Sequence, residues 1–122
     1  MSARILTVDD SASIRLTTRV ALSNAGYDVT EAVHGQEGLD KAKADSFDLI
    51  VTDLNMPIMD GLTMIEEIRK VPSLTGTPII FLTTESDADL KARAKAAGAT
   101  GWLTKPFDPE NLVKIVRKVL GK

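Results

Sequence analysis

The chain has 122 residues, a length typical of one domain, and it contains no cysteine. Fifteen lysine and arginine residues against 17 aspartate and glutamate residues give a formal net charge of −2 at pH 7. Disulfides and thiolate metal sites are therefore excluded, and the slightly acidic balance argues against a broad nucleic-acid-binding surface. No charged leader precedes an apolar segment, and no apolar run is long enough to cross a membrane. We expect a cytoplasmic single domain over residues 1–122, with no output domain.

Short apolar runs alternate with amphipathic segments along the whole chain. Five strands are predicted, at residues 5–8, 27–32, 49–53, 78–82 and 101–104. Five helices follow them in turn, at residues 12–25, 35–44, 61–71, 87–97 and from 109 onward, with a loop at 72–78. The second strand is the most polar, which favours a position near a sheet edge. This alternation predicts an α/β fold, with a parallel sheet covered by helices on both faces.

Polar side chains follow the predicted strands at the points where they end. In a parallel sheet these ends share one edge, where ligands of open α/β sheets bind. The residues placed at that edge are Asp9, Asp10, Asp53, Thr83 and Lys105. Three neighbouring carboxylates repel one another, and Mg²⁺ suits a site that relieves such repulsion through oxygen ligands. An aspartate beside a hard cation and a lysine can attack phosphorus, so the pattern predicts an aspartyl-phosphate site.

The same residues carry a resemblance to a known family. The motifs are Asp9-Asp10 with Ser11, Asp53 ahead of Met56-Pro57 and Asp60-Gly61, Thr83, and Lys105-Pro106-Phe107. Over essentially its whole length the chain resembles response-regulator receiver domains, most closely single-domain chemotaxis regulators of the CheY type. The resemblance implies a flavodoxin-like (βα)5 fold with strand order 2-1-3-4-5. It also implies a cis peptide bond between Lys105 and Pro106.

By this resemblance Asp53 is the phosphoacceptor of the chain. Asp9, Asp10, Asp53 and the backbone carbonyl of Asn55 would hold Mg²⁺, the implied cofactor. The expected chemistry is self-phosphorylation and self-dephosphorylation at Asp53. The chain would accordingly be a signalling phosphoprotein of a two-component system and not an enzyme with a separate substrate.

The resemblance also implies a switch around the phosphoryl group. Thr83 and Lys105 would act with Asp53 as catalytic residues by binding the phosphoryl oxygens. Trp102 stands where the family more often has tyrosine or phenylalanine, and it would form the switch with Thr83. A partly buried core tryptophan is the alternative interpretation of Trp102. Asn55 and Glu85 would tune how long the phosphoryl group survives.

The implied partners follow from these roles. A histidine kinase, with a chemotaxis kinase favoured, would supply the phosphoryl group. The surface formed by the fourth helix, the fifth strand and the last helix would bind a target. The favoured target is the flagellar motor switch protein, which would link the chain to chemotaxis and flagellar rotation. A phosphatase is a possible further partner, and we expect a monomer without nucleic-acid binding or membrane insertion.

Other functions remain open at this point. A phosphorelay shuttle, a phosphate sink or a cell-cycle receiver would use the same site. An aspartyl-phosphate phosphatase or phosphotransferase acting on small substrates is a more remote alternative. Such enzymes of the haloacid-dehalogenase type place a second aspartate two residues after the nucleophile, where this chain has Asn55. A flavin-binding electron carrier is disfavoured because Asp9 and Asp10 would repel a bound phosphate.

Overall fold

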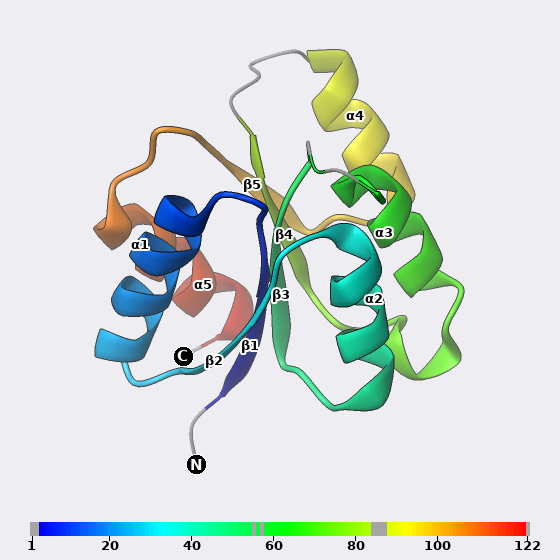
Figure 1. Cartoon of the computed structure of the whole chain (residues 1–122). Coiled ribbons are helices and arrows are strands. Elements are labelled where there is room, and N and C mark those ends of the chain that lie inside the picture. Colours follow the sequence, from blue (N-terminus) through cyan, green and yellow to red (C-terminus); the bar gives the residue numbers. More distant parts are fainter. Residues whose placement is uncertain (1–2, 55, 57, 84–87, 122) are drawn as a thin grey trace.

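The computed structural model describes residues 3–54, 56, 58–83 and 88–121, and it shows a parallel sheet between two layers of helices (Figure 1). The strands are β1 (Arg4–Val8), β2 (Asp28–Ala32), β3 (Leu49–Asp53), β4 (Ile79–Thr83) and β5 (Gly101–Thr104). The helices are α1 (Ala12–Asn24), α2 (Gly35–Ala44), α3 (Gly61–Arg69), α4 (Ala88–Ala97) and α5 (Pro109–Leu120), with a 3₁₀ helix η1 (Pro72–Leu74). The strand order β2-β1-β3-β4-β5 confirms the predicted fold class and topology.

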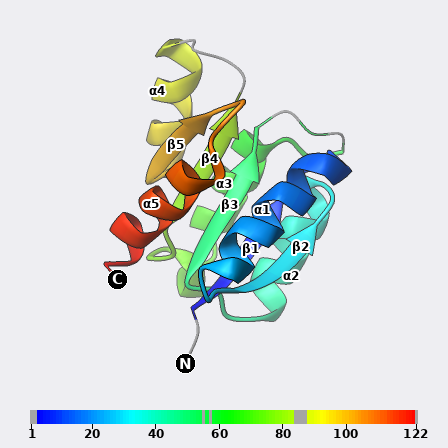
Figure 2. The ribbon, with the colours of Figure 1, turned by 90° about the vertical axis from the view of Figure 1, so that its left-hand side faces the viewer.

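The central strand β3 explains why two helical layers are needed. All five of its residues are buried, and successive side chains point to opposite faces of the sheet. Leu49 and Val51 pack in the hydrophobic cluster beneath α1 and α5, whereas Ile50 packs in the cluster beneath α2, α3 and α4. Figure 2 shows α1 and α5 lying together on one face of the sheet. A strand buried on both sides therefore appears in the sequence as a continuous apolar run.

Polar caps set the starts of the helices that surround the strand ends. The side chain of Ser11 accepts a hydrogen bond from the Ile14 backbone N–H (3.4 Å), which makes Ser11 the N-cap of α1. Asp60 caps α3, and Asp108 caps α5. Gly26, with φ of 95°, ends α1 as expected of a residue in the left-handed region. These caps fix where each helix begins and thereby shape the loops around the site.

Some predicted bounds were wrong in detail. The predicted loop at 72–78 contains η1. Helix α3 ends at Arg69, two residues early, because Pro72 disfavours helical backbone at the preceding Val71, which is extended. His34 directly precedes α2 as its N-cap, and its Nδ1 accepts a hydrogen bond from the Glu37 N–H (3.1 Å). Two strands also differ by one residue, because β2 begins at Asp28 and β4 covers Ile79–Thr83, so that β4 ends on Thr83 itself.

Candidate functional site

Three carboxylates meet at the carboxyl edge of the sheet. Asp9 and Asp10 directly follow β1, and Asp53 is the last residue of β3. One oxygen from each of the three lies within 4.8 Å of the others. Asp9 and Asp53 are 3% and 7% exposed, whereas Asp10 is open to solvent. This oxygen-only donor set, partly buried and partly reachable from water, fits a hard divalent cation such as Mg²⁺.

A single ammonium group lies between the two buried carboxylates. Lys105 Nζ is 3.0 Å from Asp9 Oδ2 and 3.2 Å from Asp53 Oδ2. The Lys105 backbone N–H donates to the carbonyl of Thr83 (2.7 Å), and the Lys105–Pro106 peptide bond is cis, as the resemblance implied. Arg15 donates to the backbone carbonyl of Asp9 (2.7 Å), and among the described residues only Lys105 forms an ion pair with these carboxylates. The three carboxylates therefore outnumber the cations paired with them.

Asp53 is held in an environment that disfavours its charged form. Burial raises the pKa of the Asp53 carboxyl, and the nearby charge of Asp9 raises it further. Two interactions lower this pKa without outweighing burial. Lys105 lies beside the carboxyl, and the Leu54 backbone N–H donates to Asp53 Oδ1 at 2.8 Å. A bound cation would relieve the same electrostatic cost, so the cluster favours cation binding.

The turn that carries Asp53 into α3 depends on glycine. A β-carbon at Gly61 would overlap the carbonyl oxygen of Asp53 and lie 2.9 Å from the Leu54 Cα. The Gly61 N–H instead donates to the Leu54 carbonyl at 2.9 Å. Glycine here allows the start of α3 to press against the end of β3. The sequence motif Asp60-Gly61 does not by itself indicate this close approach.

Within the same turn Ile58 has a φ of 69°, in the left-handed region. For an L-residue this conformation costs about 1–2 kcal/mol, and it is especially unusual for a β-branched side chain. Ile58 is also 79% exposed. The sequence does not mark this position as unusual, because nothing in its immediate neighbours requires a positive φ.

Of the remaining predicted residues, Thr83 and Trp102 lie in the described part of the chain and two others do not. Thr83 is fully buried at the end of β4, on the edge that carries the carboxylates. Trp102 lies on β5 and is 45% exposed, with its ring stacked 6.2 Å from that of Phe81 and Lys91 Nζ 4.9 Å above it. The tryptophan therefore points outward in this structure. The predicted tuning residues Asn55 and Glu85 lie outside the described residues.

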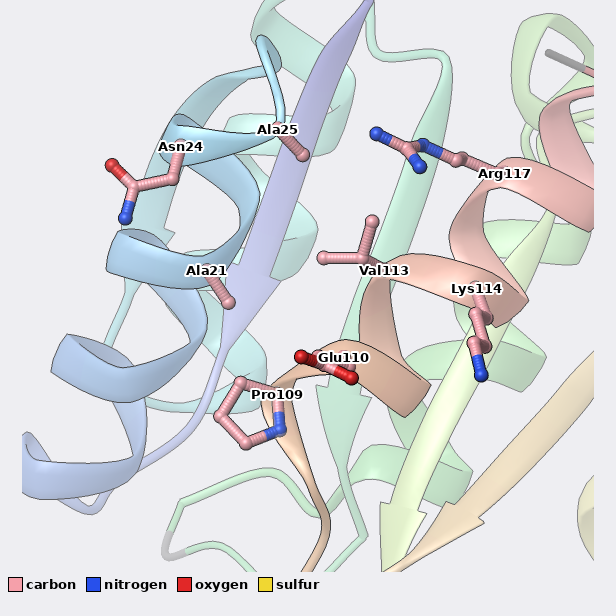
Figure 3. A pocket seen from close by; sticks show the side chains of 8 residues that line it. All are labelled: Ala21, Asn24, Ala25, Pro109, Glu110, Val113, Lys114 and Arg117. Atoms are coloured by element: carbon pink, nitrogen blue, oxygen red, sulfur yellow. The ribbon is translucent and has the colours of Figure 1, made fainter.

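A groove elsewhere on the surface is separate from this site. It has a volume of about 400 Å³ and lies between α1 and α5 (Figure 3). Its lining residues are Ala21, Asn24, Ala25, Pro109, Glu110, Val113, Lys114 and Arg117. None of the three clustered carboxylates lines this groove. None of the helices in the described ranges has the length and apolarity needed to cross a bilayer.

Comparison with curated proteins gives two kinds of relatives. The response regulator receiver domain model matches residues 5–117. Chemotaxis protein CheY1 of Helicobacter pylori is 39% identical over 121 residues, which cover 97% of each chain. The probable transcriptional regulator ycf29 of Porphyra purpurea is 33% identical over 98% of this chain, but that match covers only 57% of ycf29. The chain thus spans about half the length of some of the relatives that it matches.

Solved structures give the same result. Chemotaxis protein CheY4 of Vibrio cholerae is 45% identical, with a TM-score of 0.94 and coverage of 98% of this chain and 99% of CheY4. The receiver domain of a sensor histidine kinase from Pseudomonas aeruginosa, which has a magnesium ion coordinated in its active-site cleft, is 28% identical with a TM-score of 0.92 over the whole of both chains. Together with the fold and the acidic edge, these matches show that the chain belongs to the response-regulator receiver domain family.

Proposed function

We propose that Asp53 accepts a phosphoryl group from a histidine kinase and that the phosphorylated chain then binds a target protein. The observation that carries this proposal is the position of Lys105 Nζ between Asp9 and Asp53, with Asp10 completing a cluster of oxygens. Such a cluster combines a nucleophilic carboxylate with a fixed cation and room for a divalent ion. Membership of the receiver family supports the same roles for these residues.

In the proposed reaction an oxygen of Asp53 attacks the phosphorus of a phosphohistidine. A P–O bond forms as the P–N bond breaks, and the electron pair stays on the imidazole nitrogen, which takes up a proton from water. Lys105 and Thr83 would contact the transferred oxygens and stabilise their charge. Mg²⁺ held by Asp9, Asp10, Asp53 and the carbonyl of Asn55 would supply further positive charge beside the phosphoryl group.

The proposed output surface comprises α4, β5 and α5. A groove of about 360 Å³ beside Trp102 is lined by Ile115 and Val119 of α5, with Lys118 at its side. An apolar floor with one basic side chain beside it suits a partner segment that carries both apolar and acidic side chains. Movement of Thr83 towards the phosphoryl group would change the packing beneath Trp102 and so alter this surface.

A role in chemotaxis is the favoured setting, with the flagellar motor switch as the target. The matches to CheY1 and CheY4 over nearly their full lengths support this setting. They also support the proposal that residues 1–122 work as one receiver domain. The match to part of the longer ycf29 favours a second candidate, in which a receiver of this type controls transcription.

The test is intact-mass measurement after incubation with acetyl phosphate and Mg²⁺. We expect one labile phosphoryl adduct on the wild type, none on the Asp53→Asn variant, and almost none in the presence of a chelator. Asparagine keeps the shape of the side chain but removes the nucleophilic charge, so the variant is a matched control. Absence of an adduct on the wild type, with acetyl phosphate and with a phosphohistidine donor, would refute the proposal.

A further inference from the structure

One cation beside the acidic cluster has no part in the proposed phosphoryl transfer. Arg15 lies half-buried near the start of α1, and its Nη1 donates to the backbone carbonyl of Asp9 at 2.7 Å. Among the described residues its guanidinium has no other hydrogen-bond partner and no ion pair. A positive charge near the amino end of a helix opposes the helix dipole, and it also repels a bound cation. Arg15 is therefore at a position that electrostatics alone disfavours.

The residue that Arg15 contacts is fixed through all four of its polar atoms. The Asp9 N–H donates to the carbonyl of Ala32 (3.1 Å), and the Asp9 carbonyl accepts from Arg15. Asp9 Oδ1 accepts from the Ser11 N–H at 2.9 Å, and Oδ2 pairs with Lys105 Nζ at 3.0 Å. Asp9 is consequently held from β2, from α1 and from the segment after β5.

The neighbouring Asp10 combines a free side chain with a fixed backbone. Its carboxylate is exposed and forms no hydrogen bond or ion pair with the described residues. The peptide plane before Asp10 contains the Asp9 carbonyl, which accepts from Arg15. The plane after Asp10 contains the Ser11 N–H, which donates to Asp9 Oδ1. Because these two planes set the direction of the Cα–Cβ bond, they determine where the Asp10 carboxylate can reach.

We propose that Arg15 is a positioning residue for the divalent cation. The inference rests on the proposed function, in which Asp10 is a ligand of Mg²⁺, and it adds the residue that directs this ligand. By holding the Asp9 carbonyl, the guanidinium keeps the peptide plane from turning, so the Asp10 carboxylate needs little rearrangement when the ion enters. Groups that orient a ligand without touching the metal commonly change metal affinity by about 10–100-fold.

Charge and positioning predict opposite results for Arg15→Met. If Arg15 acted only through its charge, the substitution would strengthen Mg²⁺ binding, because it removes the repulsion between two cations. If Arg15 acts by positioning, the substitution weakens Mg²⁺ binding although that repulsion is gone. The sign of the change in affinity therefore separates the two roles.

The test is calorimetric titration of Mg²⁺, at constant ionic strength, into the wild type, Arg15→Met, Arg15→Lys and Arg19→Met. Lysine keeps the charge and an N–H donor. Arg19 lies one turn further along α1 and pairs with Glu31 at 3.4 Å, so Arg19→Met is the matched control. We expect the dissociation constant of Arg15→Met to rise about tenfold and that of Arg15→Lys about two- to threefold. The constant of Arg19→Met should stay within about twofold of the wild type.

Phosphorylation by acetyl phosphate gives a second readout. The Mg²⁺ concentration for half-maximal rate should rise about tenfold in Arg15→Met, whereas the rate at saturating Mg²⁺ should stay within about twofold of the wild type. Denaturant unfolding with a chelator shows whether each variant is folded. If Arg15→Met does not fold, Arg15→Gln takes its place, because the shorter polar side chain also loses the contact with Asp9.

The other outcomes count against the inference in identifiable ways. An unchanged or stronger Mg²⁺ affinity in Arg15→Met would refute the positioning role while leaving the acceptor role of Asp53 in place. An Arg15→Lys variant that binds Mg²⁺ as weakly as Arg15→Met would contradict a role through the hydrogen bond to Asp9. An equal loss in Arg19→Met would show a general effect of charge on α1 and would also contradict the inference. A wild type that binds no Mg²⁺ would refute the proposed metal site itself, and the inference with it.

Discussion

Each end of the sheet holds carboxylates around one basic side chain, and the two clusters have opposite electrostatics. At the amino ends of the strands, Arg4 binds both oxygens of Asp45 at 2.7 Å, and its backbone N–H donates to Asp48 at 2.7 Å. The Arg4 guanidinium lowers the pKa of the Asp45 carboxyl to about 2. At the carboxyl ends, burial raises the pKa of Asp53 although Lys105 lies beside it.

The difference comes from burial and from the ratio of charges. The Arg4 cluster is open to solvent, and the planar guanidinium matches a carboxylate through two hydrogen bonds. The other cluster sets one ammonium against three carboxylates, two of them nearly fully buried. The first arrangement ties β1 to the loop before β3. The second leaves negative charge uncompensated and thereby favours the binding of a divalent cation, as expected where a buried charged cluster costs stability.

The largest change in stability and in reactivity is expected from Lys105→Met, which leaves two buried carboxylates without their ammonium group. The free energy of unfolding should fall by about 3 kcal/mol, and the rate of phosphorylation by acetyl phosphate should fall about a hundredfold. Denaturant unfolding and timed intact-mass measurements would show both. Lys114→Met on the exposed face of α5 is the control and should change neither. A Lys105→Met variant of full stability and normal rate would contradict our description of the cluster.

The next effect concerns the backbone that positions Asp53. In Gly61→Ala the added methyl group would overlap the Asp53 carbonyl, so the junction of β3 and α3 must shift. We expect a loss of about 2–3 kcal/mol in the free energy of unfolding. Gly76→Ala, where a β-carbon meets nothing within 4 Å, should stay within about 0.5 kcal/mol of the wild type. Similar stabilities for the two variants would contradict a close approach at Gly61.

A smaller effect, with a defined pH dependence, is expected from Asp53→Asn in the presence of a chelator. The Asp53 pKa is raised in the fold, so the folded chain binds this proton more tightly than the unfolded chain. The carboxyl therefore costs stability as pH rises through and above the unfolded value of 3.8. Asparagine removes that cost, and the variant should be more stable than the wild type at pH 7. The difference should vanish below the unfolded pKa, and a less stable variant at pH 7 would contradict the predicted sign.

The smallest effect is expected at the Arg4 cluster. The Asp45 pKa is lowered in the fold, so its contribution to stability is present above the unfolded value of 3.8 and is lost as pH falls towards about 2. Asp45→Asn should accordingly be slightly less stable than the wild type at pH 7. Denaturant unfolding should show this deficit shrinking below about pH 4 and in high salt. A deficit that is independent of both would indicate a steric cause.

The arrangement of residues at the carboxyl edge of the sheet could be predicted from the sequence because it follows from topology. A parallel sheet brings all strand ends to one edge, so Asp9, Asp53 and Thr83 had to lie there once their strands were recognised. The cis bond at Lys105–Pro106 was available only through the resemblance, since short-range preferences favour the trans form. Where a strand ends could be read locally. The cis or trans form of the peptide bond after β5 could not be read in this way.

The missed features depend on contacts that local sequence patterns do not encode, some within one turn and some between distant segments. The positive φ of Ile58 and the overlap that requires Gly61 arise from the way the turn after β3 packs on β3 itself. The Arg4–Asp45 pair joins residues 41 positions apart. Arg69 similarly donates to the carbonyl of Gly98, across 29 positions. Neither periodicity nor local motifs carry information about such pairs, and only the folded chain shows them.

The central claim is that the acidic cluster at the carboxyl edge of the sheet binds a divalent cation. Thermal unfolding during a Mg²⁺ titration at constant ionic strength tests this claim most directly. Asp10 is exposed, and Lys105 pairs with the other two carboxylates, so Asp10→Asn should remove a metal ligand without disturbing the ion pairs. Our account predicts that the melting temperatures of the wild type and Asp45→Asn rise together with Mg²⁺, and that Asp10→Asn responds far less. A wild type that is insensitive to Mg²⁺, or an Asp10→Asn variant that responds equally, would contradict it.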